Sequence, residues 1–254
     1  MGLTKPLVYF LSKMKFFNYN LTLDIDGVRL IDKNREKPIV IDCLNPHSFI
    51  TANDDPEFKQ ALEECDILLP DGVGICMEIH RYRNKQIKKI AGDDLHMHLL
   101  DELNAIGGKA FYMGSRLDVL QKIKDRITLD YPNIKVMVHS PSYAPKFSDE
   151  ENAEIVSKIE AFAPDVLLVG LTAPKQEKWI HSQLGRLTTP KVICAIGGAF
   201  EFFAGTIKRA PKWAINLHCE WLWRFMREPR RMWQRNMVST PRFLRYVKQH
   251  HEEM

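Results

Sequence analysis

The chain has 254 residues, of which 45% are hydrophobic, and it carries a net charge of +4. This length and this hydrophobic content allow a full core in one α/β domain, with or without an appendage, and argue against a disordered chain. No run of eighteen apolar residues occurs, and the N-terminal residues lack the small-residue cleavage site of a signal peptide. We therefore expect a cytoplasmic protein without a membrane-spanning helix.

Apolar runs alternate with amphipathic segments along most of the chain. The first clear strand covers 37–44, and the helix after it begins with Asp55 at the N-cap and Pro56 at the first helical position. Further strands are expected over 66–70, 110–114, 134–138, 165–171 and 191–197, with helices from about Gly74, over 94–106, 116–130 and 149–162, and from Pro174. This pattern predicts an α/β protein with a Rossmann-like, mostly parallel sheet that helices cover on both faces.

The loops at the carboxyl ends of the strands are where a sheet of this type binds ligands. The loops to consider therefore follow Cys43, Pro70, Met113, Gly170 and Ile196. Neither the P-loop pattern G-x-x-x-x-G-K-[ST] nor the dinucleotide pattern G-x-G-x-x-G occurs in them. The sequence thus gives no support to a P-loop kinase or to a dehydrogenase.

Asp71 lies in the segment LLPDGVG (68–74), between the end of an expected strand and two glycines. Asp-Gly is a common turn dipeptide, so Asp71 can serve only to form a turn. A strand end can also present a carboxylate to a ligand, and glycine lets a ligand approach the backbone closely. The residues alone leave both interpretations open.

The segment VGLTAPKQEKW (169–179) places polar side chains at a strand end and in the first turn of a helix. Free N–H groups and the helix dipole favour an anion such as a diphosphate at this point. Glu177 can instead complement the dipole, whereas Gln176 has less reason to lie there unless it hydrogen-bonds to a ligand. A ligand site and an ordinary helix start remain alternatives.

Metal-binding patterns are weak. The Asp-x-Asp of LDIDG (23–27) can bind Mg²⁺ or Mn²⁺, but its position before the first clear strand favours a hairpin turn. His96 and His98 are two residues apart on an expected helix and point in different directions, which disfavours a shared metal ion. The five cysteines are scattered without a C-x-x-C pair and are interpreted as buried thiols.

The positive charge is concentrated near the C-terminus. Between Lys208 and Lys248 the chain has eleven Lys and Arg residues against two glutamates, and four of the five tryptophans lie in 209–249. We expect helices over 211–227 and 230–249, interrupted at Pro229, and divide the chain into an α/β domain (1–209) and a helical appendage (210–254). Tryptophan beside arginine suits an anionic membrane surface, although nucleic acid or a diphosphate would also accept such residues.

Several of these segments, taken in order, resemble the WecG/TagA/CpsF family of bacterial glycosyltransferases. The resemblance runs from about Asn20 to Phe243 and covers most of the chain. Its motifs are LNPHSF (44–49), DPEF…AL…CDILLPDGVGI (55–75), AGDDL (91–95), APKQEKW (173–179), GGAFEFFAGTIKRAPKW (197–213) and EWLWRFMREPRR (220–231).

The resemblance implies an inverting, metal-independent enzyme. Such an enzyme moves an N-acetylhexosamine, or its uronic acid, from a UDP-sugar to the 4-hydroxyl of N-acetylglucosamine on a polyprenyl diphosphate, in the synthesis of a cell-surface polysaccharide. It would work as a peripheral protein at the inner face of an anionic membrane. No cofactor and no nucleic acid are expected, and a homo-oligomer is left open because the apolar appendage could pack against a second subunit.

Residue roles follow from the same resemblance. Asp71 matches the aspartate proposed as general base, Asn45 and Gln176 match pocket positions, and Arg224 and Arg231 match arginines that neutralise a diphosphate. Further substrate contacts are expected from Gly72, Gly74, Asp94, Thr172, Lys175, Glu177 and Arg209.

Two positions depart from the family pattern. Cys43 stands where some relatives have a threonine, and Thr172-Ala173 replaces a glycine followed by another small residue. Either change could alter the choice of donor sugar. A non-catalytic nucleic-acid-binding protein is the alternative to the enzyme, and a nucleotide-dependent oxidoreductase is a third class that the missing G-x-G-x-x-G already disfavours.

Overall fold

The protein is described by a computed structural model that covers residues 11–207, 225–226 and 229–254. Eight strands of these residues form one sheet with the order β1-β2-β4-β3-β8-β7-β5-β6. The strands are β1 (Lys13–Phe16), β2 (Tyr19–Thr22), β3 (Ile39–Leu44), β4 (Ile67–Pro70), β5 (Lys109–Gly114), β6 (Lys135–His139), β7 (Val166–Gly170) and β8 (Val192–Ala195). β1 and β2 pair antiparallel, and every other pairing in the sheet is parallel.

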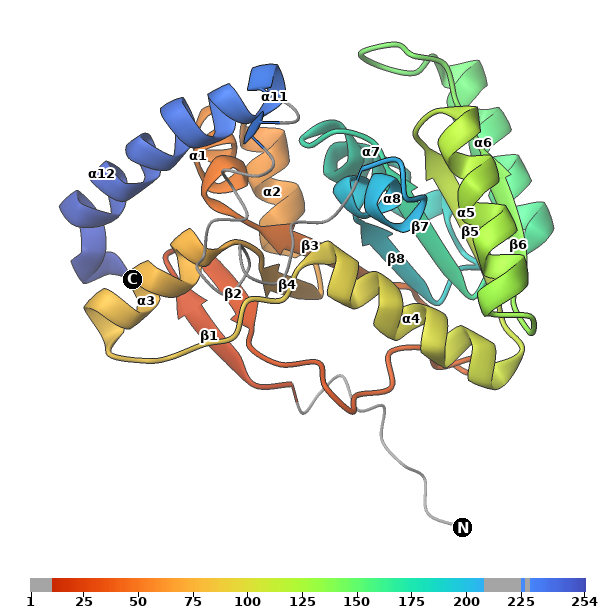
Figure 1. The fold of residues 1–254 in the computed structure, drawn as a ribbon, viewed down its shortest axis with the longest axis horizontal. Coiled ribbons are helices and arrows are strands. Elements are labelled where there is room, and N and C mark those ends of the chain that lie inside the picture. The colour runs from red at the N-terminus through yellow and green to blue at the C-terminus, as the bar shows by residue number, and fades with distance from the viewer. Residues whose placement is uncertain (1–10, 208–224, 227–228) are drawn as a thin grey trace.

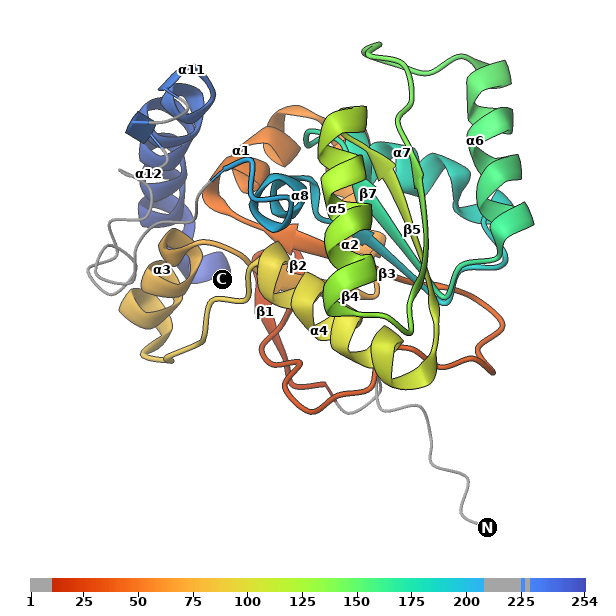
Figure 2. The same cartoon turned by 45° about the vertical axis from the view of Figure 1, so that its right-hand side comes forward.

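Helices lie on both faces of the sheet, as Figures 1 and 2 show. They are α1 (Pro46–Asp54), α2 (Pro56–Glu64), α3 (Val73–Arg83), α4 (Gly92–Ile106), α5 (Leu117–Asp130), α6 (Asp149–Phe162), α7 (Lys175–Gln183), α8 (Gly197–Phe203), α11 (Pro229–Trp233) and α12 (Thr240–His250). Shorter helical turns are η2 (Leu184–Arg186), η3 (Gln234–Ser239) and η4 (His251–Glu253). The α/β class and the mostly parallel sheet expected from the sequence are therefore confirmed.

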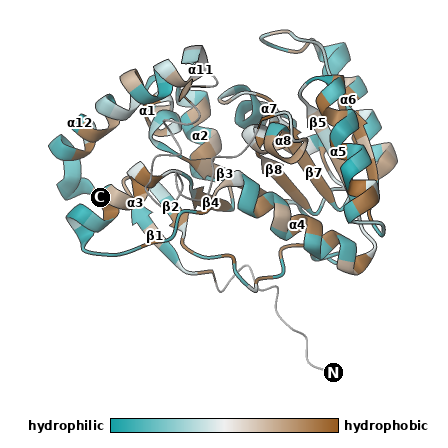
Figure 3. Ribbon diagram, viewed as in Figure 1, coloured by the Kyte–Doolittle hydropathy of each residue, from teal (hydrophilic) through white to brown (hydrophobic). Residues whose placement is uncertain are grey.

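Alternation along the strands divides the core between the two faces. In β5, Ala110 and Tyr112 pack with residues of α4, α5 and α8, whereas Phe111 and Met113 pack with residues of α6 and α7. Successive side chains of a strand point to opposite faces, so a strand that is buried on both sides is apolar throughout. Figure 3 shows this in the hydrophobic colouring of β7 and β8 beneath helices of mixed hydropathy.

The helix start expected at Asp55 is confirmed, and a glycine ends another of the expected helices. Asp55 is the N-cap of α2, and its side chain accepts a hydrogen bond from Phe58 N. Gly107 ends α4 in the left-handed conformation, with φ at 63°. Each satisfies backbone groups that a helix end leaves unpaired.

The sequence analysis placed the turn of the N-terminal hairpin at the wrong residues. Its turn lies at Phe17 and Asn18, between β1 and β2, and the LDIDG segment instead leaves the sheet after β2. There Asp24 Oδ1 accepts from Asp26 N, and Asp26 forms an ion pair with Lys88 at 2.9 Å. The two aspartates thus have structural partners within a loop.

The C-terminal helices pack on the body of the protein. Phe243 and Val247 of α12 are fully buried in one cluster with Phe16 of β1 and Phe49 of α1. The expected helix over 230–249 is divided, because η3 is a π-helical turn that leads into α12. Proline lacks a backbone N–H and its ring clashes with the preceding turn, which accounts for the changed winding just before Pro241. Of the helix expected over 211–227, the structure describes only residues 225–226.

Candidate active site

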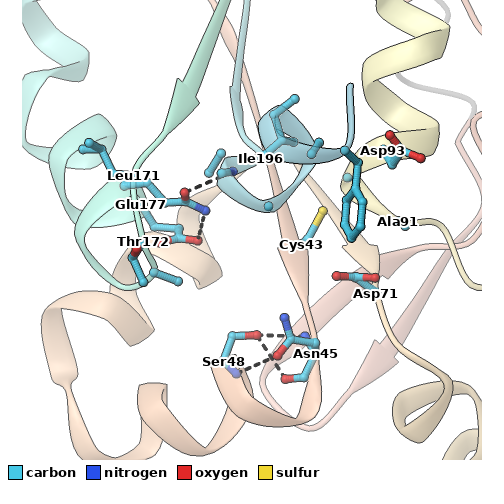
Figure 4. A pocket seen from close by; sticks show the side chains of 18 of the residues that line it. Cys43, Asn45, Ser48, Asp71, Ala91, Asp93, Leu171, Thr172, Glu177 and Ile196 are labelled. Carbon is cyan, nitrogen blue, oxygen red and sulfur yellow. Dashed lines mark hydrogen bonds between the residues drawn. The ribbon is translucent and has the colours of Figure 1, made fainter. Parts of the chain in front are cut away.

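A cavity lies at the carboxyl ends of four adjacent strands, β4, β3, β8 and β7 (Figure 4). Its wall is completed by the N-terminal turn of α4 and by η3. Four of the five loops chosen from the sequence therefore meet at one cavity. The loop after β5 does not line it. This is the place where open α/β sheets bind ligands.

Asp71 lines the cavity directly after β4. Its backbone N–H donates to Leu44 O at 2.8 Å, which fixes the start of the loop against the neighbouring strand β3. Figure 4 shows the carboxylate on the same side of the cavity as Cys43. Burial raises the pKa of the Cys43 thiol, and the Asp71 carboxylate raises it further. Asp71 is thus both the residue that leaves the strand and a carboxylate at the cavity, while its catalytic role stays a prediction.

The local backbone and packing explain why glycine occupies positions 72 and 74. Gly72 has φ at 103°, a conformation that favours glycine, and it caps the N-terminus of α3. A Cβ at Gly74 would lie 2.8 Å from Pro46 Cγ, so this glycine lets α3 approach α1. Neither glycine lines the cavity. Their contact with substrate, expected from the resemblance, stays a prediction.

Asn45 and Ser48 form the cavity wall at the start of α1. Asn45 Oδ1 accepts from the backbone N–H groups of His47 and Ser48 at 3.0 Å each, and Ser48 Oγ accepts from Asn45 N at 2.8 Å. This reciprocal capping box fixes the Asn45 side chain. The expectation that Asn45 belongs to the pocket is confirmed in position, and the contact with a ligand is not tested.

Gln176 and Glu177 lie in the first turn of α7 and are nearly fully buried at the cavity. Gln176 Nε2 donates to Glu177 Oε1 at 2.9 Å, while Gly197 N donates to Gln176 Oε1 at 3.2 Å. These two hydrogen bonds fix the orientation of the Gln176 side-chain amide. Burial raises the pKa of Glu177 to about 7. Thr172 lines the same wall from the loop after β7.

Lys175 and Asp94 lie close to the cavity but do not line it. Lys175 Nζ donates to Ala144 O and lies 3.5 Å from the centre of the Phe147 ring. Asp94 Oδ2 accepts from Ala91 N at 3.0 Å and caps α4, while Asp93 lines the cavity. Both residues therefore have structural partners, and a direct substrate contact by either is untested.

Two cations of the cavity wall were missed by the sequence analysis. Lys89 precedes α4, and Arg235 comes from η3 and is 59 residues further along the chain than Gln176. The charge of Arg235 lowers the pKa of His47, where burial has the larger effect, and that of Glu177, where burial and hydrogen bonds have larger effects. Composition offered a basic C-terminal segment but no signal that singled out Arg235.

The side chains of the three arginines named from the resemblance lie outside the described part of the structure. Arg209 and Arg224 lie outside the described residues, and for Arg231 the structure places only the backbone, in α11. Within the described ranges, no group of three or more His, Cys, Asp or Glu residues could hold a metal ion. No helix found there is long and apolar enough to cross a membrane.

His96 and His98 point to different partners, Tyr112 and Glu102, as their spacing predicted.

Comparison with known proteins identifies the family. Residues 18–253 match the model of the glycosyl transferase WecG/TagA/CpsF family. An N-acetylglucosaminyldiphosphoundecaprenol N-acetyl-beta-D-mannosaminyltransferase of Bacillus subtilis (strain 168) is 32% identical over 234 residues, which cover 92% of this chain and 88% of the relative. A protein of the same name from Bacillus spizizenii is 30% identical over 247 residues, or 97% of this chain and 91% of the relative. The chain therefore belongs to the WecG/TagA/CpsF family of glycosyltransferases, and it is an enzyme of that class.

Proposed function

We propose that this enzyme transfers N-acetylmannosamine from a UDP-sugar to N-acetylglucosamine carried on a polyprenyl diphosphate. The names of the two relatives give the sugar and the acceptor of those proteins. The observation that carries the proposal is the cavity itself, where the Asp71 carboxylate faces a wall that also contains Lys89 and Arg235. A sugar-nucleotide transferase needs both a base and charge compensation, and this cavity offers both.

Asp71 is the proposed general base. It takes the proton from the 4-hydroxyl of the acceptor sugar as that oxygen attacks the anomeric carbon of the donor. The bond from the anomeric carbon to the diphosphate breaks at the same time, and attack from the opposite side inverts the configuration. The position of Asp71 at the end of β4, with its backbone bonded to β3, holds the carboxylate at the cavity.

Lys89 and Arg235 are the proposed partners of the donor diphosphate. The leaving UDP carries the negative charge that develops when the glycosidic bond breaks, and nearby cations stabilise that charge. Arginine can bind two phosphate oxygens at once, whereas lysine acts as a point charge. In this proposal the residues of the chain compensate the charge and no metal ion is required.

The lipid-linked acceptor implies that the enzyme works at a membrane surface. Among the described C-terminal residues, Met226, Trp233 and Met237 are exposed large hydrophobic side chains. Amphipathic tryptophan and nearby basic residues favour the headgroup layer of anionic lipids. Trp233→Ser should therefore weaken co-sedimentation with anionic vesicles. Unchanged binding would contradict a membrane contact at this residue.

The test of the function is a transfer assay with UDP-N-acetylmannosamine and a short-chain lipid diphosphate-N-acetylglucosamine. Asp71→Asn should lower kcat by about 100-fold or more, because the amide cannot accept the proton. Asp101→Asn, which changes an exposed carboxylate of α4, is the matched control and should keep full turnover. Near wild-type turnover of Asp71→Asn would remove the general-base assignment. Addition of EDTA should leave turnover unchanged, and loss of activity that Mg²⁺ restores would refute metal independence.

A further inference from the structure

Two buried carboxyl groups, one of which lines the cavity, are not used by the chemistry proposed so far. Asp42 is on β3 and is 1% exposed, and Glu177 is in the first turn of α7 and is 4% exposed. Asp42 points to the face of β3 opposite to that of its neighbour Cys43, because side chains alternate along a strand. Glu177 lines the cavity, whereas Asp42 lies behind it. The chemistry proposed above uses neither group.

Each of these carboxyl groups has one oxygen without a hydrogen-bond partner among the described residues. The atoms are Asp42 Oδ1 and Glu177 Oε2, and both are buried. Two ionised carboxylates in such a place repel each other and lack donors, which is costly. Burial, and then the charge of Glu177, raise the pKa of Asp42 well above its usual range. A proton on one of the two groups would turn an acceptor into a donor and remove the repulsion between the two charges.

The second oxygen of Glu177 connects this pair to the cavity. Glu177 Oε1 accepts from Gln176 Nε2 at 2.9 Å, and Gln176 Oε1 accepts from Gly197 N at 3.2 Å. Gln176 is therefore held at both ends of its amide. The second hydrogen of Nε2 remains for another acceptor. If Glu177 turned away, the Gln176 amide would lose the bond that fixes its orientation.

We propose that Asp42 and Glu177 share one proton and act as a positioning pair, which holds the Gln176 amide in the orientation that binds the sugar-nucleotide donor. This inference rests on the proposed function, because it needs a donor in the cavity. Glu177 acts through Gln176, and Asp42 acts through Glu177. The pair sets donor affinity, and it takes no part in the proton transfer that Asp71 carries out.

Within the described ranges, few other titratable groups interact with one or both of these carboxyls. They are the Cys43 thiol on β3, Cys65 before β4, Cys194 on β8 and the Arg235 guanidinium on η3. Burial raises the pKa of all three thiols, which keeps them neutral near neutral pH. Loss of the shared proton at higher pH therefore leaves two carboxylates with Arg235 as the facing cation. Donor affinity should fall as the pH rises.

The experiment measures the KM for the UDP-sugar, kcat, and UDP binding by calorimetry from about pH 6 to about pH 9. Glu177→Ala should raise the donor KM about tenfold and change kcat by less than about threefold, because one orienting hydrogen bond is lost. Glu177→Gln should recover most of the affinity, since its amide offers a donor to Asp42 and an acceptor to Gln176. Asp42→Asn should remove the rise of KM with pH, because no proton has to be shared. Glu154→Ala, an exposed glutamate on α6, is the control.

Distinct results separate this inference from the function on which it rests. A wild-type enzyme that neither binds UDP nor transfers sugar would overturn both. An active wild type with a donor KM unchanged in Glu177→Ala, or with the same pH dependence in Asp42→Asn, would overturn the positioning pair alone. If Glu177→Ala does not fold, Asp42→Asn decides the matter, since the amide is isosteric and keeps a partner for Glu177.

Discussion

Replacing Phe243 by alanine tests whether the C-terminal helices are part of the main core. Phe243 of α12 has no exposed surface and packs against Phe49 of α1, with 5.3 Å between ring centroids, and against Phe16 of β1 at 6.4 Å. The variant removes an aromatic ring from a cluster that joins the two ends of the chain. We expect global destabilisation and not merely fraying of α12.

The magnitude follows from the burial of the ring. A fully buried phenylalanine that becomes alanine costs about 3–5 kcal/mol, since the transfer free energy is lost and a cavity is left. For a chain of this size, each kcal/mol lowers the melting temperature by about 2–4 °C, so the expected decrease is about 6–20 °C. Leu244 is on the same helix and is 41% exposed. Leu244→Ala should cost about 1 kcal/mol or less.

Thermal unfolding followed by circular dichroism and calorimetry measures both variants. The reasoning predicts one cooperative transition that shifts down strongly in Phe243→Ala and only slightly in Leu244→Ala. Two separate transitions, or equal and small shifts, would show that residues 229–254 form an independent unit. That result would favour the division at residues 209–210 expected from the sequence, which the structure does not test directly.

Two further predictions concern the start of α1, where Pro46 and His47 lie. Gly74→Ala should destabilise the protein by about 1–3 kcal/mol in denaturant unfolding, because the new Cβ would lie 2.8 Å from Pro46 Cγ. Gly185→Ala, where no atom lies within 4 Å of the added Cβ, should have little effect, and equal losses would contradict this account. Burial, and then the charge of Arg235, lower the pKa of His47 to about 4. The neutral ring is therefore favoured in the folded state, and the free energy of unfolding should fall as the pH drops from about 6.5 toward 4. This fall should be smaller in His47→Gln. Parallel pH profiles of the two proteins would refute this account.

The central strands could be predicted because they are buried on both faces. β3, β4, β5, β7 and β8 are short, buried apolar runs, and the helices between them have recognisable caps, such as Asp55 before α2. β1 and β2 were missed, since the segment KMKFFNYNLT mixes lysines and asparagines with aromatic residues, and both strands are only four residues long. Burial of Phe16 depends on α12, which lies more than 220 residues away in sequence.

Two helices at the cavity were also missed, for local reasons. α1 begins at Pro46 and ends where the N-cap of α2 begins, so its sequence reads as a loop between a strand and a helix. The Asn45-Pro46 pair with Ser48 was a usable signal, since it forms a capping box. α8 begins with Gly197 and Gly198, and glycine disfavours a helix when judged by propensity alone.

The candidate site was predictable in the part that strand ends determine. Asp71, Asn45, Thr172, Gln176 and Glu177 all line the cavity, because parallel strands bring their carboxyl ends to one edge. Lys175 shows the limit of such reasoning. A lysine at a helix start suggests an anion site, but its ammonium group contacts Ala144 O and the Phe147 ring of a neighbouring loop.

Arg235 connects the stability of the fold to the charge of the cavity. It reaches the cavity from η3, and η3 is held by two contacts with the body of the protein. Ser239 Oγ lies 2.8 Å from His47 Nδ1 at the start of α1, and the following helix buries Phe243 in the N-terminal cluster. The same α1 provides Asn45 and Ser48 to the cavity wall. A change that shifts the packing of α12 within the folded protein should therefore weaken binding of UDP, because the guanidinium is displaced while Asp71 keeps its position. Phe243→Ala, studied below its melting temperature, should show reduced UDP affinity in calorimetry, whereas Leu244→Ala should not. Equal affinities in the two variants would mean that Arg235 is positioned independently of α12.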